Sequence, residues 1–137
     1  MGAMDRTTLY EGDFHAWSQE QARILRELGR AGLRLPNDLD LEHVAEEIED
    51  LGNEQRFVVE GNLVQALSHL IKIVAFPADD AVRPWTKEAN AFLDNAASRY
   101  RPSMRQAMDP AKLWARACRR ATLDLEVDGH AVPALPR

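Results

Sequence analysis

The feature that most constrains this chain is a long stretch without proline, from Leu39 to Ala75. Its first part places apolar side chains at helical spacing, namely Leu41, Val44, Ala45, Ile48 and Leu51. The same period resumes after Gly52 and continues to Val74. A stripe of this kind predicts one very long helix, continuous or bent near Gly52, against which the rest of the chain packs.

Shorter amphipathic stretches lie on both sides of this segment. The first follows Asp13, a residue that favours the N-cap position, and the last follows Asp109-Pro110, which is typical of a helix start. We expect these helices over residues 14–29, 85–99 and 110–127, and the sequence has no strand pattern. The predicted fold is therefore all-α, a four- to five-helix bundle built around a central helix at about residues 39–75.

The length of 137 residues suits one domain with one core. We expect residues 1–8 to be a cloning remnant and lead-in, residues 9–128 to form a single helical domain, and residues 129–137 to be a flexible tail. The tail is rich in proline and follows Asp128-Gly129, a pair that ends helices.

The central helix is long for a domain of this size. A helix over the whole stretch would span roughly 54 Å. A compact monomer of this length has a diameter under about 40 Å. The helix must therefore bend, or it must lie against a second copy of the chain, and we expect a homodimer.

Composition favours a reducing compartment. The chain has a single cysteine, Cys118, so it can form no internal disulfide. It shows no basic segment followed by an apolar segment at its start, and no uninterrupted run of about 18–20 apolar residues. We therefore expect a cytoplasmic protein with no membrane partner.

The net charge of −5 hides a strong asymmetry. The segment from Asp38 to Glu60 has nine acidic residues and one basic residue, Arg56. The segment from Arg99 to Arg120 has seven basic residues and one acidic residue, Asp109. Mutual attraction is the simplest use of two such segments, and the acidic total makes nucleic acid an unlikely partner.

The richest group of potential ligands lies at the start of the central helix. It consists of Asp40, His43, Glu46 and Glu47. A single helical face could present these carboxylates and the imidazole to a divalent metal, but known two-metal bundles draw such ligands from several helices. Acidic residues near a helix N-terminus more often complement the helix dipole and face solvent, so we expect no cofactor and keep a metal as the alternative.

Four further residues could make polar contacts or ligand contacts between helices: His15, His69, Lys72 and Trp85. A histidine beside an apolar stripe is more often a hydrogen-bonded packing residue than a ligand. No phosphate-binding glycine loop, paired-cysteine zinc motif or nucleophile elbow is present. The sequence therefore predicts no catalytic residue.

Three blocks of the sequence resemble a known family. They are Leu9–Trp17 with Gln19–Ala22, Leu39–Gly52, and Leu67–Lys72 followed by Trp85. Their order and spacing resemble the bacterial "domain of unknown function 29" family, over Leu9 to about Leu125. The resemblance implies a small, soluble, all-helical cytoplasmic protein, and it implies no activity, because the family has none assigned. Ile73 stands where relatives often have tryptophan, and Thr86–Asn90 replaces an arginine-rich stretch, which weakens a nucleic-acid role further.

Two functions follow from these observations. The first is a non-enzymatic helical module for protein–protein interaction and oligomerisation. The alternative is a helical bundle that binds a metal or a small ligand through the face from Asp40 to Glu47, either as an enzyme or as a binding protein.

Overall fold

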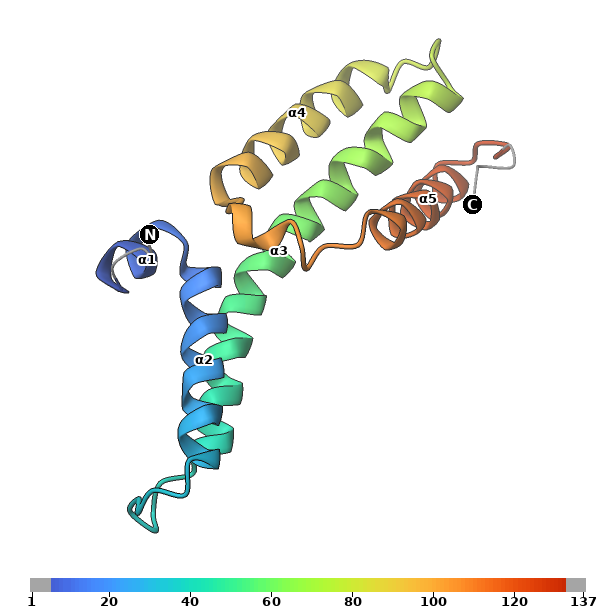
Figure 1. The fold of residues 1–137 in the computed structure, drawn as a ribbon. Helices are drawn as coiled ribbons and strands as arrows, with labels where there is room; N and C mark the ends of the chain where they lie inside the picture. The colour runs from blue at the N-terminus through green and yellow to red at the C-terminus, as the bar shows by residue number, and fades with distance from the viewer. Residues whose placement is uncertain (1–5, 133–137) are drawn as a thin grey trace. The chain divides into compact units, whose positions relative to one another are not determined.

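The computed structural model describes residues 6–132, and this part of the chain contains five α-helices, one 3₁₀ turn and no strand (Figure 1). The elements are α1 (Arg6–Gly12), α2 (Phe14–Arg30), α3 (Leu41–Ala75), α4 (Val82–Arg99), η1 (Pro102–Met104) and α5 (Pro110–Val127). The predicted all-α class and the long central helix are confirmed. The helix α3 continues without interruption through Gly52.

Two of the predicted helix starts are confirmed by their caps. Asp13 Oδ1 accepts the Ala16 N–H at 2.9 Å, and Asp109 Oδ1 accepts the Ala111 N–H at 3.0 Å. The helix α4 begins at Val82, earlier than predicted. Its N-cap residue has no capping side chain, but the preceding turn is held by Asp79 Oδ1, which accepts the Ala81 N–H at 2.8 Å.

The lead-in before Asp13 contains a helix that the sequence analysis did not predict. It forms α1, and the ring of Tyr10 makes edge contacts with Phe14 at 5.6 Å and with Trp17 at 4.9 Å between centroids. Aromatic contacts of this kind add to the stability given by burial, so they favour an ordered segment here. The predicted cloning remnant lies outside the described residues.

The described chain forms two compact units. One consists of the residues up to Phe57 together with Arg101–Ala107, and the other begins at Val58 and includes Met108 onward. Each unit contains one half of α3. The expectation of a single helical domain over residues 9–128 stays a prediction.

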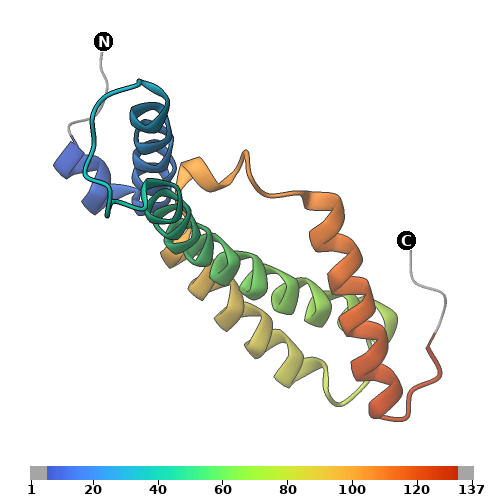
Figure 2. The same cartoon turned by 90° about the horizontal axis from the view of Figure 1, so that it is seen from below.

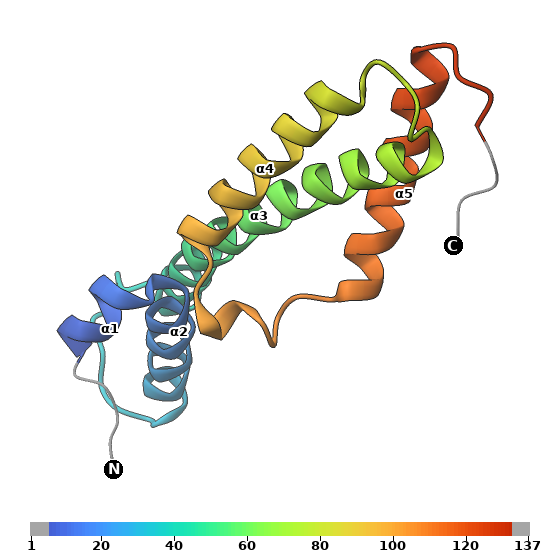
Figure 3. The ribbon, with the colours of Figure 1, turned by 90° about the horizontal axis from the view of Figure 1, so that it is seen from above.

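In the first unit, α2 lies beside the first half of α3 (Figure 3). Small residues form the seam between these two helices. Ser18, Ala22 and Ala45 lie in it, and none of them has exposed surface. A Cβ on Gly52 would lie only 2.8 Å from Ser18 Cβ and still nearer to Ser18 Oγ. Gly52 is therefore the point where the two helices approach most closely, since no larger residue fits there.

In the second unit, α4 runs beside the second half of α3 in each view (Figure 1, Figure 2), and α5 packs on the same half. The core between α3 and α5 is apolar and consists of Val64, Ile71, Leu113, Ala117, Cys118 and Ala121. Trp85 of α4 is buried, whereas Trp114 of α5 is 36 % exposed and is not a core residue.

His130, at the start of the predicted tail, makes contacts within the second unit. The His130 N–H donates to the Leu125 carbonyl at 2.9 Å, and His130 Nε2 lies 2.6 Å from Asp79 Oδ2. The histidine ring also contacts Phe76 at 4.6 Å between centroids. Local sequence gave no sign of this contact, because the partners are far away along the chain. Residues 133–137 lie outside the described residues.

We predict that Gly52→Ala destabilises the protein by about 1–3 kcal/mol, because the added methyl group overpacks the seam against Ser18. Gly61→Ala is the matched control in the same helix, since a Cβ there meets nothing within 4 Å. The control should gain stability by about 0.5–1 kcal/mol from helix propensity. Urea denaturation followed by circular dichroism measures both, and equal effects would contradict the close approach.

Candidate functional site

The acidic and histidine face that was kept as an alternative metal site is exposed to solvent. Asp40 and His43 pair with each other at 2.6 Å, and their side chains are 64 % and 74 % exposed. Glu46 and Glu47 are exposed as well. Among residues 6–132 no three His, Cys, Asp or Glu side chains are grouped so that they could hold a metal ion.

Asp40 has a structural role instead. Its Oδ1 accepts the His43 N–H at 3.3 Å, so the carboxylate caps the start of α3. The hydrogen bond between the two side chains lowers the pKa of Asp40 and raises the pKa of His43. This pairing follows from their spacing of three residues at a helix N-terminus.

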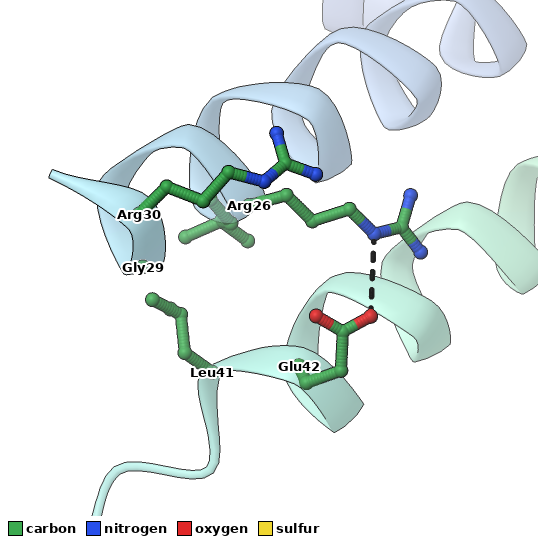
Figure 4. Close-up of a pocket in the computed structure, with 6 residues that line it drawn as sticks. Arg26, Gly29, Arg30, Leu41 and Glu42 are labelled. Carbon is green, nitrogen blue, oxygen red and sulfur yellow. Dashed lines mark ion pairs between the residues drawn. The ribbon is translucent and has the colours of Figure 1, made fainter.

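Other acidic residues of α3 pair with α2. Arg26 NH1 donates to Glu49 Oε2 at 2.6 Å, and Arg26 Nε lies 3.5 Å from Glu42 Oε1. Figure 4 shows Arg26 reaching from α2 to Glu42 at the edge of a hollow of about 310 Å³, which Arg30 and Leu41 also line. These ion pairs hold one flank of α2 against one flank of α3.

His15 belongs to a buried hydrogen-bond chain in the first unit. Ser103 Oγ donates to Asp13 Oδ1 at 2.8 Å and lies 2.8 Å from His15 Nδ1. Because the hydroxyl proton goes to Asp13, the histidine must donate from Nδ1, which leaves Nε2 as an acceptor. Nε2 is buried and has no hydrogen-bond partner within the described residues. The chain fastens η1 to the start of α2.

A shallow cavity of about 540 Å³ lies beside this chain. His15, Ala16, Gln19, Ser103, Gln106 and Ala107 line it. Its walls carry neutral polar groups, and the Asp13 carboxylate beneath them is already occupied by Ser103 and by the Ala16 N–H. Sequence reasoning selected His15 but missed Ser103, which is 88 residues away along the chain.

The other three predicted polar positions meet in the second unit. Lys72 is 4 % exposed, its Nζ lies 3.4 Å from Asp124 Oδ2, and it sits 5.4 Å from the centroid of the Trp85 ring. One turn earlier, His69 Nε2 lies 3.0 Å from Glu88 Oε2. The group thus joins α3 to α4 and to α5, and His15 lies apart from it in the first unit. These are polar contacts between helices.

Burial sets the protonation of both buried histidines. Desolvation lowers the pKa of His69, and the nearby charge of Lys72 lowers it further, against the opposing effect of Glu88. Desolvation likewise lowers the pKa of His15, with Asp13 opposing. Both histidines are therefore neutral at pH 7. The neutral state favours a packing role for these side chains.

Cys118 is not a reactive thiol. Arginines flank it in the sequence, but the side chain is buried in the apolar core, and burial raises the pKa of the Cys118 thiol. A protonated buried thiol is a poor nucleophile.

The helix α3 is also apolar enough to pass a test for a membrane span. An 18-residue window of it has a mean hydropathy of 1.3, and 44 % of that window is buried inside the protein. A core helix of a packed domain has the same length and composition. The absence of a membrane partner therefore stays a prediction.

We predict that the protein loses stability as the pH falls below about 6.5, the unfolded pKa of histidine. The unfolded chain then binds protons that neutral His15 and His69 exclude, so the stability they contribute is present above that pH and is lost toward their lower folded pKa. His15→Asn keeps a donor to Ser103 but does not titrate. Its urea midpoint should change less between pH 7.5 and 5.5 than that of the wild type, and an equal change would contradict the assignment.

We also predict that Asp124→Ala destabilises the protein by about 1–2 kcal/mol, because it leaves the buried ammonium of Lys72 without its carboxylate. Lys72→Met removes the charge as well and should cost less. Glu126→Ala, an exposed change in the same helix, is the control and should stay within about 0.5 kcal/mol of wild type. Thermal denaturation measures all three, and a larger loss for Lys72→Met than for Asp124→Ala would contradict the prediction.

Comparison with known proteins agrees with the fold and gives no activity. The chain is similar to an alpha-helical protein of unknown function from Rhodospirillum rubrum, a crystal structure, with 32 % identity and a TM-score of 0.79. The match covers 93 % of this chain and 81 % of the other. No curated protein matches.

The family model of the domain of unknown function DUF29 matches residues 9–136. This match covers the three sequence blocks on which the resemblance was based. The chain therefore belongs to the DUF29 family.

Proposed function

We propose that this protein is a non-enzymatic helical module for protein–protein interaction, and that it acts in the cytoplasm as a homodimer without a metal or cofactor. The observation that carries the proposal is an exposed apolar face on the pair formed by α2 and the first half of α3. We define the apolar face by six residues, of which Ile24, Val44 and Leu51 are exposed and Trp17, Leu28 and Ile48 are half-buried.

The contacts between the two helices define the side on which this face lies. Arg26 and Gln19, on one flank of α2, reach Glu49 and Asn53 on one flank of α3. At about 100° per residue, the six residues of the apolar face project from the opposite flanks. One side of the helix pair is therefore polar and the other is apolar, which supports an interface on the apolar side.

Several members of the apolar face remain in solvent. Ile24 is 43 % exposed, Val44 is 40 % exposed and Leu51 is 52 % exposed. Single exposed apolar residues are ordinary, but several on one face usually mark an interaction site. Burying such side chains stabilises an interface by about 25 cal/mol for each Å² of apolar surface.

A second copy of the chain can cover the apolar face, and no other protein is then required. Two antiparallel helix pairs that meet through their apolar faces make a four-helix bundle, and a two-fold axis makes the contact self-complementary.

The alternative of a metal- or small-ligand-binding bundle, enzymatic or not, has less support. Its proposed ligands on the face from Asp40 to Glu47 are exposed, and among residues 6–132 they are not grouped in a set of three that could hold a metal ion. Asp40 is also engaged as a helix cap.

We predict that Leu51→Glu converts the dimer into a monomer, because it places a charge at the most exposed residue of the apolar face. Leu93→Glu, at a similarly exposed leucine of α4, is the matched control and should leave the dimer intact. Sedimentation velocity over a range of concentrations measures both. A wild-type protein that stays monomeric at every concentration, or a Leu51→Glu variant that stays dimeric, would contradict the proposed function.

A further inference from the structure

A basic face on α5 is not used by the fold. Lys112, Arg116 and Arg119 are exposed, and none of them makes an ion pair with a carboxylate in the part of the chain from residue 6 to 132. Arg120 differs, because its Nε lies 3.5 Å from Asp124 Oδ1. The spacing of four and then three residues puts the three unpaired cations on one side of the helix.

An acidic face on the first half of α3 is equally unused. Glu47, Asp50 and Glu54 are exposed on the side of α3 that points away from α2, and none forms an ion pair among residues 6–132. They differ in this from Glu42 and Glu49, which pair with Arg26.

The two faces match in spacing when the helices run antiparallel. Read forward, the basic residues are separated by four and then three positions. Read backward from Glu54, the acidic residues have the same separations. Both sets therefore lie at about 0, 6 and 10.5 Å along their helices. This register sets Lys112 against Glu54, Arg116 against Asp50 and Arg119 against Glu47.

We propose that the basic face of α5 docks antiparallel on the acidic face of α3 in a second copy of the chain. The inference rests on the proposed function, since it requires that two copies associate. It adds a charged contact that fixes the partner and its register. In a two-fold dimer the contact forms twice, because each copy supplies one face of each kind.

The same face of α5 makes a nucleic-acid partner a poorer fit. Leu123 and Val127 continue the face beyond Arg119, and they are 58 % and 86 % exposed. Apolar side chains gain nothing from a phosphate backbone, and a net charge of −5 opposes the approach of a polyanion. An acidic protein surface satisfies the cations without this repulsion.

The first part of the test reverses one face. Arg116→Glu with Arg119→Glu should weaken dimerisation by about tenfold or more, because it sets like charges against each other. Arg83→Glu with Lys87→Glu on α4 is the matched control, with the same change of net charge at exposed positions. Sedimentation velocity at low salt measures the dissociation constants, and the wild-type dimer should weaken as salt increases.

The second part mixes two reversed proteins. The chain with Arg116→Glu and Arg119→Glu is combined with a chain that carries Glu47→Lys and Asp50→Lys. Each alone should dimerise poorly, but both contacts of the mixed dimer are complementary, so a heterodimer of near wild-type affinity should form. Native mass spectrometry distinguishes it from the homodimers.

Each other outcome overturns the inference. A wild-type dimer that tolerates the reversals, or a mixture without heterodimer, overturns the charged contact and leaves the proposed function standing. A wild-type monomer at all concentrations overturns both. Binding of duplex DNA at low salt that is lost on Arg116→Glu with Arg119→Glu would assign the basic face to nucleic acid instead.

Discussion

The close approach of α2 and α3 at Ser18 and Gly52 governs the rest of the first unit. Small residues in the seam let the two backbones come near, so the seam itself has little room for large side chains. The larger apolar residues of both helices are displaced to one flank, while Arg26 and Glu49 hold the other. The apolar face lies on the flank opposite this pair, and the proposal that a second copy covers it rests on that face.

Sequence alone predicted the elements that local chemistry determines. Asp13 and Asp109 are capping residues beside strong helical periods, and both helices start where these signals lie. The helix α1 was missed because its order depends on Tyr10 meeting Trp17, a contact between elements. The same limit applies to Val44 and Leu51, whose period predicts a stripe but not which part of it is covered.

The candidate sites divide in the same way. Lys72, His69 and Trp85 share one face of the fold because α4 and α5 pack on the half of α3 that carries two of them. The group from Asp40 to Glu47 looked like a ligand set in sequence, but no other helix brings a partner to it. Ser103 gave no signal, since its partners Asp13 and His15 are about ninety residues away along the chain.

These observations describe a helical protein whose buried polar groups are used to join helices, and whose unused surfaces are apolar or charged. The most direct measurement of the central claim is native mass spectrometry of the purified protein, prepared without a chelator. We expect a mass that equals two chains, with no added metal or small molecule. A single chain that carries a metal or small molecule would contradict it and return attention to the face from Asp40 to Glu47.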